Sequence, residues 1–271
     1  MLSGPVGSGK TAFIDYMANK MSKTVCKVQI SDETDSKTLV GGYGCTNIPG
    51  EFEWRSGLLT TAMRLGHWLV LEDVLSGQAN LLGMLRPLLE AESLGLKPKI
   101  FNINQFNEEI IAHEDFRIIV TQSLLETEDG YREIRIGGTF SPYSSNCLNK
   151  CQTILMDKLF NTSIDAIVKA NYPSLTQLLP KLIGDQGIMK CFSTDLQSKN
   201  HNRINSPRDL FKFCQRLINM NRSEDEEATC YFLDALDCFI HHIPDKEYKN
   251  KLIVHLGSIF NLNPTNVSNF C

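Results

Sequence analysis

Hydrophobic and polar positions divide the chain into two parts with different periodicity. In the first part, short apolar runs typical of buried parallel strands cover residues 24–30, 68–71 and 116–121. Helical spacing, with apolar residues three and four apart, covers residues 10–23 and 79–92. Strands that alternate with helices predict an α/β domain built on a parallel sheet.

The second part begins near residue 157, where the strand-like runs end and amphipathic helical segments follow one another. We therefore predict two domains, an αβα core over residues 1–157 and a helical subdomain over residues 158–271. The helices predicted for the second domain cover 159–170, 175–182, 207–220, 228–243 and 248–260.

Composition argues against several classes of protein. The 271 residues carry 27 Lys and Arg against 31 Asp and Glu, a formal charge of −4, so bulk electrostatic binding to nucleic acid is not expected. No run approaches the roughly 20 apolar residues of a membrane helix, and the first residues show no secretory signal pattern. The nine cysteines are odd in number and scattered, which favours buried thiols in a reducing compartment over a disulfide framework.

A glycine-rich motif near the start of the chain is the strongest chemical signal. Its glycines let backbone N–H groups approach phosphate oxygens, while Lys10 neutralises the β- and γ-phosphates and the Thr11 hydroxyl ligates Mg²⁺. We therefore predict binding of ATP with Mg²⁺, the alternative being a chance glycine-rich turn before a helix. The pattern G-x-x-x-x-G-K-[ST] is matched by Gly4, Pro5, Val6, Gly7, Ser8, Gly9, Lys10 and Thr11.

The strand that should precede this motif is reduced to the first three residues of the chain. We therefore expect the central strand of the sheet to be missing or supplied from elsewhere, as in a fragment or a truncated gene model. Poor stability of the isolated chain is the expected consequence, and a sharp, cooperative melt at high temperature would contradict it.

Two carboxylates follow the apolar run over residues 68–71. A P-loop ATPase holds Mg²⁺ and activates the attacking water at such a strand end, usually with Asp for the metal and Glu for the water. Here the order is inverted, so Glu72 is the candidate metal ligand beside Thr11, and Asp73 is the candidate for polarising water. Because Asp73 is one methylene shorter than Glu, we expect nucleotide binding to survive and hydrolysis to be slow. A solvated acidic pair at a strand end is the alternative.

Dispersed motifs resemble the AAA+ branch that includes midasin, MoxR-type and dynein-related ATPases. The resemblance is to the AAA+ modules of the midasin family in particular, and the Glu-Asp order favours the first of its tandem modules. The motifs that carry it lie over residues 32–39, 50–59, 66–73, 86–90, 100–113, 116–117, 172–175 and 206–210.

What the resemblance implies is an AAA+ P-loop NTPase core with strand order 5-1-4-3-2, its first strand truncated, plus a C-terminal helical lid with ATP at their junction. It also implies that this chain is one piece of a ring-shaped ATPase found in the nucleus (nucleolus and nucleoplasm). Such a ring remodels pre-60S ribosomal particles, releasing assembly factors and supporting nuclear export. Its partners would be neighbouring AAA+ modules, the pre-60S particle and the assembly factors, with no membrane and no specific nucleic acid. A non-hydrolysing structural module and a MoxR-like AAA+ cochaperone stay open as alternatives.

Further site residues rest on the resemblance alone. The polar sensor of the fourth strand falls at Ser123, where Asn is usual, with Gln122 as a possible substitute. Arg208 resembles the second sensor, an arginine that reaches the γ-phosphate and closes the lid, and a surface charge at a helix start is the alternative. The arginine-finger segment has no match, and Arg132 and Arg135 are the nearest arginines.

Overall fold

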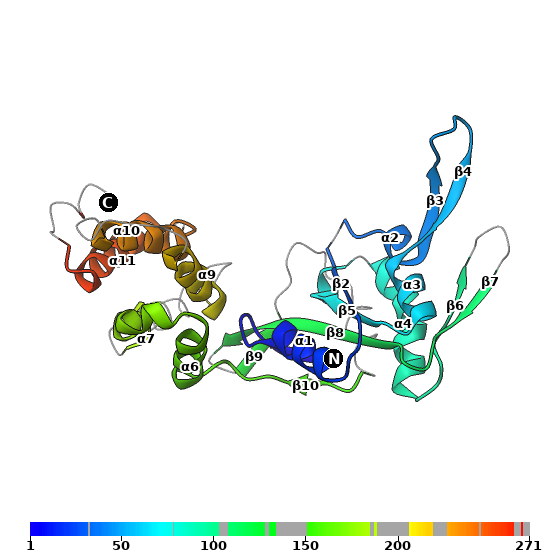
Figure 1. Ribbon diagram of the computed structural model, residues 1–271, viewed down its shortest axis with the longest axis horizontal. Helices are drawn as coiled ribbons and strands as arrows, with labels where there is room; N and C mark the ends of the chain where they lie inside the picture. Colours follow the sequence, from blue (N-terminus) through cyan, green and yellow to red (C-terminus); the bar gives the residue numbers. More distant parts are fainter. Residues whose placement is uncertain are drawn as a thin grey trace. The chain divides into compact units, whose positions relative to one another are not determined.

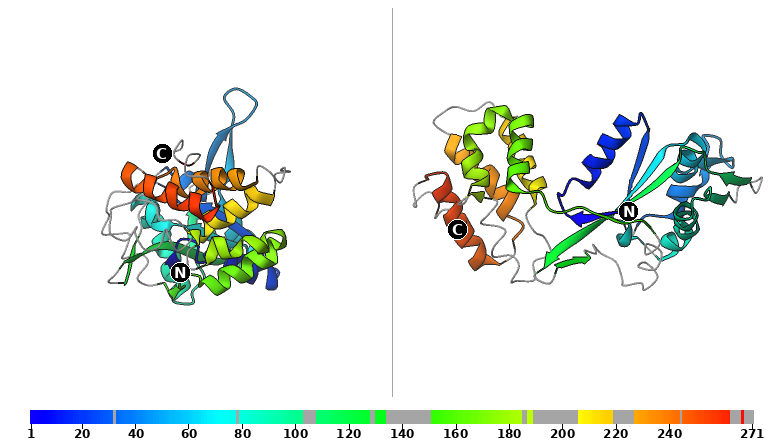
Figure 2. Two further views of the ribbon diagram at one scale, coloured as in Figure 1. Left: turned by 90° about the vertical axis from the view of Figure 1, so that its left-hand side faces the viewer. Right: turned by 90° about the horizontal axis from the view of Figure 1, so that it is seen from below.

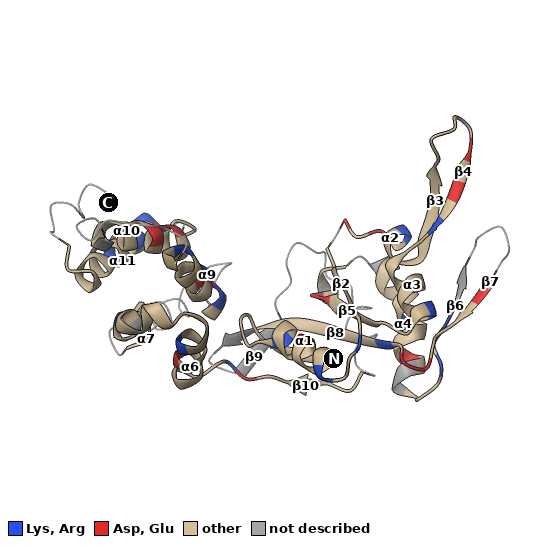
Figure 3. Cartoon of the chain, viewed as in Figure 1, with Lys and Arg blue, Asp and Glu red and all other residues tan. Residues whose placement is uncertain are grey.

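The structure is a computed structural model that describes residues 1–31, 33–77, 79–102, 108–127, 130–133, 151–184, 187–188, 206–218, 227–243, 245–262 and 267. Its residues form two compact units. Unit 1 comprises Met1–Pro5, Gly9–Glu126 and Gly130–Asp157, and unit 2 comprises Val6–Ser8, Thr127–Asp129 and Lys158–Cys271. Figure 3 shows Lys and Arg as well as Asp and Glu on elements of both units.

A parallel sheet forms the centre of unit 1 (Figure 1). Its strand order is β10-β1-β8-β5-β2, which is the predicted order 5-1-4-3-2, and β9 (Gly130–Glu133) pairs with β8 outside this path. The apolar runs of the sequence locate the strands well, because residues buried on both faces of a sheet cannot alternate with polar ones. The five parallel strands are β1 (Leu2–Pro5), β2 (Val25–Gln29), β5 (Trp68–Glu72), β8 (Arg117–Thr127) and β10 (Ile154–Leu155).

The first strand corrects one prediction. Leu2–Pro5 form β1 between β10 and β8, so the central position of the sheet is filled by this chain itself and the expectation of a missing strand is wrong. Parallel pairing joins Leu2 to Thr121 and Pro5 to Leu124 on one side, and Leu2 to Ile154 on the other. Backbone pairing needs no bulky side chain, which is why a run containing serine, glycine and a terminal proline still makes a strand.

Helices pack against this sheet and bury its apolar side chains. A cluster of fully buried residues, among them Leu69, Leu71, Leu85 and Phe116, joins β5, β8 and α4. The helix predicted over 10–23 ends at Lys20, where the chain turns toward β2. The helices of unit 1 are α1 (Lys10–Lys20), α2 (Ser36–Val40), α3 (Leu58–Leu65), the 3₁₀ turn η1 (Val74–Ser76) and α4 (Ala79–Ser93).

Two antiparallel hairpins extend from unit 1 (Figure 1). The first pairs β3 (Gly41–Cys45) with β4 (Phe52–Ser56), and an edge-to-face contact between the rings of Tyr43 and Trp54 at 5.2 Å stiffens it. The second pairs β6 (Lys99–Asn102) with β7 (Glu108–Ile111).

Unit 2 is helical apart from its loops, within the residues that the structure describes (Figure 2). Its core contains Phe213, Phe232 and Phe239, with the rings of Phe213 and Phe239 5.7 Å apart. No helix in the described part of the chain is long and apolar enough to span a bilayer. The helical elements are α6 (Asn161–Asn171), η2 (Pro173–Leu178), α7 (Leu179–Ile183), α9 (Pro207–Ile218), α10 (Glu227–Ala235), the π-helical η5 (Leu236–Ile240) and α11 (Lys246–Ile259).

Candidate nucleotide-binding site

The glycine-rich motif forms the connection between β1 and α1. Gly7 and Gly9 have φ angles of +81° and +88°, a backbone conformation that glycine adopts without the strain a Cβ brings. Gly9 is the residue before the first turn of α1, and its carbonyl accepts the first intrahelical bond from the Phe13 N–H at 2.8 Å. The motif therefore ends on a helix N-terminus, whose free N–H groups and positive dipole suit an anionic phosphate.

Lys10 is the first residue of α1 and is only 8% exposed. Its Nζ donates to the carbonyl oxygens of Gly4 and Pro5, both at 2.8 Å, so the ammonium group curls back over the end of β1. A buried ammonium group needs such acceptors, and phosphate oxygens are stronger acceptors than carbonyls. This placement fits the predicted role of Lys10 as the residue that neutralises phosphate charge.

Thr11 and Glu72 meet although 61 positions separate them in the chain. The Thr11 hydroxyl donates to Glu72 Oε1 at 2.8 Å, and Glu72 is the last residue of β5. Hydroxyl and carboxylate oxygens are hard ligands of the kind that Mg²⁺ takes, alongside water and substrate phosphates. The two residues predicted to hold magnesium are therefore side by side, and their oxygens suit Mg²⁺.

Asp73 is held from two sides. Its Oδ1 accepts a hydrogen bond from Ser123 Oγ at 2.8 Å, and its Oδ2 accepts one from Gln29 Nε2 at 3.1 Å. Its backbone is in the left-handed region, with φ 51° and ψ 48°, where it starts the 3₁₀ turn η1. Gln29 of β2 and Ser123 of β8 therefore hold in place the carboxylate that the sequence predicts to polarise water.

Ser123, and not Gln122, lies at this edge of the site. Successive residues of a strand point to opposite faces. Gln122 is 5% exposed, and its amide oxygen accepts from Ser3 Oγ at 3.4 Å, away from Asp73. The alternative in which Gln122 takes the place of the polar sensor is therefore wrong, because it is Ser123 that contacts Asp73.

Gln29 is a site residue that sequence reasoning missed. It is the last residue of β2 and is paired in register with Glu72 of β5. The available signal was its position, because polar residues at the carboxyl ends of adjacent parallel strands gather at one edge of the sheet.

Of the arginines named from the resemblance, the structure describes the side chain of Arg208 only. Arg208 is the second residue of α9 in unit 2 and is exposed, so its role toward a nucleotide stays a prediction. The side chain of Arg132 and all of Arg135 lie outside the described residues. Next to Arg208, the Ser206 N–H and hydroxyl donate to Asp209 Oδ2 at 3.0 and 3.1 Å, which closes the first turn of α9. Within the described parts of the chain, no three His, Cys, Asp or Glu side chains are grouped to hold a metal.

Comparison with known families gives two matches that follow the two parts of the chain. Residues 1–132 match the model "AAA domain (dynein-related subfamily)", and residues 164–263 match the "Midasin AAA lid domain".

Three relatives show how far the likeness extends. Midasin of Dictyostelium discoideum is 24% identical over 314 aligned positions, covering 97% of this chain and 5% of the relative. Protein CbbQ of Hydrogenophilus thermoluteolus is 31% identical over 121 positions, covering 45% of this chain and 42% of CbbQ. Protein NorQ of Paracoccus denitrificans is 30% identical over 132 positions, covering 47% of this chain and 46% of NorQ. The chain thus spans a small part of midasin and less than half of each bacterial relative.

The sheet order, the phosphate-binding loop and the acidic strand end define a P-loop nucleotide-binding domain of the AAA+ class. Together with both family matches, they show that the chain belongs to the AAA+ ATPase family, as a core with its lid.

Proposed function

We propose that the chain is a magnesium- and ATP-binding module of a midasin-like ring ATPase, one that remodels pre-60S ribosomal particles in the nucleus by releasing assembly factors. The observation that supports this most is the lid, because residues 164–263 match the lid of midasin and the Dictyostelium alignment covers 97% of the chain. Neighbouring modules of the same ring would be its partners, since AAA+ sites receive an arginine from the adjacent module.

The chain's own residues bind the nucleotide in this proposal. Backbone N–H groups of the motif hold the phosphates, and Lys10 exchanges its carbonyl acceptors for phosphate oxygens. Thr11 and Glu72, already 2.8 Å apart, hold Mg²⁺. The bound metal supplies positive charge that offsets the charge of the phosphates.

A second candidate is a module that holds ATP without turning it over. Both carboxylate oxygens of Asp73 accept hydrogen bonds, from Ser123 and Gln29. A carboxylate whose two oxygens are already held by protein donors is less available to orient and polarise a water molecule. This geometry supports slow hydrolysis at this site, with the neighbouring modules of the ring doing most of the work.

A MoxR-like cochaperone is the alternative at the level of the whole protein. CbbQ and NorQ are 31% and 30% identical to this chain, against 24% for the Dictyostelium midasin. These bacterial likenesses cover less than half of the chain, whereas the midasin alignment also includes the lid. The lid is therefore the part that favours the midasin-like reading.

Equilibrium titration with a fluorescent ATP analogue, with and without Mg²⁺, tests the nucleotide site. Lys10→Ala should abolish saturable binding, whereas Lys20→Ala, at the exposed end of the same helix, should leave it unchanged. Asp73→Asn should leave binding intact and should slow hydrolysis only if this site turns over. Wild-type affinity in Lys10→Ala would refute the proposed site.

An exchange experiment tests the ring and its partner. This chain would replace the first AAA+ module of a midasin in cells, and the yield of large ribosomal subunits would be measured on sucrose gradients. Restored yield with the wild-type chain, lost with Lys10→Ala, would support the midasin-like proposal. A fluorescent fusion that stays outside the nucleus, or an exchange that restores nothing although the chimaera is expressed, would argue against it.

A further inference from the structure

A cysteine and a histidine meet at the amino-terminal end of the parallel sheet. Cys26 is the second residue of β2, and His67 directly precedes β5. The Sγ atom of Cys26 lies 3.6 Å from Nδ1 of His67, and a thiol can donate a hydrogen bond to a neutral imidazole nitrogen. The nucleotide site lies at the other, carboxyl ends of the same two strands, where Gln29 and Glu72 are, so this pair belongs to a different part of unit 1.

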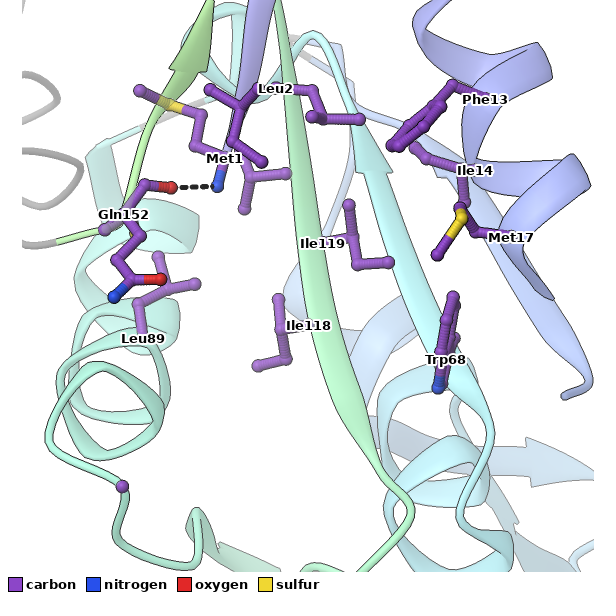
Figure 4. Close-up of a pocket in the computed structure, with 14 residues that line it drawn as sticks. Met1, Leu2, Phe13, Ile14, Met17, Trp68, Leu89, Ile118, Ile119 and Gln152 are labelled. Carbon is purple, nitrogen blue, oxygen red and sulfur yellow. Dashed lines mark hydrogen bonds between the residues drawn. The ribbon is translucent and has the colours of Figure 1, made fainter. Parts of the chain in front are cut away.

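The side chains of this pair lie on the face of the sheet away from α1. Figure 4 shows Trp68 on the same side of the sheet as Met17 of α1, where both line a mostly apolar cavity. Successive residues of a strand point to opposite faces, so His67 and Leu69 point away from α1. Cys26 is paired in register with Leu69 and packs against the buried cluster that contains Leu69. Cys26 and His67 are both half-buried there, so only small reagents can reach the thiol.

The backbone of His67 is held by the end of α3. Gly66 ends this helix in the left-handed region, with φ 72°, and the His67 N–H donates to the Ala62 carbonyl at 3.0 Å. The next N–H, of Trp68, donates to the Thr24 carbonyl at 2.9 Å, which holds the start of β5 against β2. The imidazole is therefore presented to the thiol from a fixed backbone position.

Other cysteines of the described residues differ from Cys26 in access. Cys214 and Cys238 are buried, and burial raises the pKa of each thiol, to about 11 for Cys214. These thiols stay protonated near neutral pH and are closed to reagents. Cys45 is exposed on β3 and serves as an accessible reference. Cys26 combines partial exposure with a neighbouring group that can take its proton, which activates a cysteine as a nucleophile.

We propose that Cys26 is a site of modification by hydrogen peroxide, with His67 as the group that takes and returns the proton. The thiol proton passes to Nδ1 of His67, and the thiolate attacks one peroxide oxygen. An S–O bond forms as the O–O bond breaks, and the leaving hydroxide takes the proton from the imidazolium to become water. The sulfur is thereby oxidised to sulfenic acid while the peroxide is reduced, and no further reactant is needed.

Dimedone labelling of sulfenic acid in the full chain, read by peptide mass spectrometry, tests this. After brief peroxide treatment at about pH 7, Cys26 should be labelled about ten-fold faster than Cys45, because an unassisted thiol is only a few per cent thiolate at this pH. His67→Gln keeps a polar side chain but cannot carry the proton, so it should slow Cys26 about ten-fold and leave Cys45 unchanged. His113→Gln is the matched control and should change neither rate, since the Nδ1 of His113 already accepts from the Asp115 N–H.

Three results would overturn the proposal. The first is labelling of Cys26 no faster than that of Cys45. The second is an unchanged Cys26 rate in His67→Gln, with urea unfolding showing that the variant is folded. The third is a faster Cys26 rate in His67→Gln, because a substitution that only loosens the packing exposes the thiol further. If His67→Gln does not fold, the comparison of Cys26 with Cys45 in the wild-type chain still decides the question.

Discussion

Replacing Asp73 tests whether its left-handed backbone is strained, and the structure gives the size of the effect. At φ 51° a non-glycine residue carries a cost of about 1–2 kcal/mol, somewhat less for Asp and Asn. Asp73 offsets this with side-chain hydrogen bonds from Ser123 and Gln29, each worth about 0.5–1.5 kcal/mol. Asp73→Ala keeps the backbone cost and loses both bonds, so its free energy of unfolding should fall by about 2 kcal/mol.

Glycine and asparagine at the same position separate the two contributions. Asp73→Gly also loses both hydrogen bonds but removes the backbone cost. The greater conformational entropy of its unfolded chain lowers the free energy of unfolding by about 0.4–1 kcal/mol. We therefore expect Gly to be more stable than Ala by about 0.5–1 kcal/mol, and Asn, which still accepts from Ser123 and tolerates this backbone, to lie near the wild type.

Urea unfolding followed by Trp68 fluorescence measures this order, because Trp68 lies on β5, the strand that leads into Asp73. A Trp54→Phe background leaves Trp68 as the one tryptophan that reports on unfolding. An Asp73→Ala variant as stable as Asp73→Gly would refute the argument, since the left-handed conformation would then carry no cost.

Three further predictions concern the metal, the base and a buried thiol. Thr11→Val should remove the enhancement of ATP binding by Mg²⁺ while affinity in EDTA stays within about two-fold, as titration with and without the metal will show. Gln29→Ala frees one oxygen of Asp73 and should raise single-turnover hydrolysis about five-fold, the equivalent of one hydrogen bond of about 1 kcal/mol; unchanged turnover with intact binding would contradict it. Burial raises the pKa of the Cys214 thiol from 9.0 to about 11. The unfolded chain therefore ionises first, and the contribution of Cys214 to stability, which is present below pH 9, is lost as the pH rises from 9 to 11. The fall in the urea midpoint between about pH 8 and 10 should be smaller in Cys214→Ala than in Cys45→Ala, which changes an exposed thiol.

The strands were predictable because burial restricts side-chain choice, whereas the strand order came from the resemblance to the AAA+ family. The run predicted over 24–30 is Val25–Gln29 in the structure, and the run over 68–71 is Trp68–Glu72. The prediction of β1 failed for the opposite reason. Its hydrogen bonds come from the backbone, so Ser3 and Gly4 pair with β8 although neither residue type signals a strand.

The site was predictable in its composition and not in its contacts. Motif spacing singled out Lys10 and Thr11, and the end of the apolar run over residues 68–71 singled out Glu72. Gln29 belongs to no motif. Only its place at the end of a predicted strand pointed to it, and its bond to Asp73 depends on how β2 and β5 align. The left-handed backbone of Asp73 could not be predicted either, because glycine is the residue type whose presence in a sequence indicates such a conformation.

The two acidic residues have different contacts because their backbone positions differ. Glu72 is the last paired residue of β5, and its longer side chain reaches the Thr11 hydroxyl across the end of the sheet. Asp73 follows in a left-handed turn, and its short side chain is held by donors from β2 and β8. In the proposed site, the inverted order leaves Glu72 beside Thr11 as a candidate metal ligand and gives the shorter side chain to the residue that would reach the water. This arrangement is the structural basis of our proposal that hydrolysis at this site is slow.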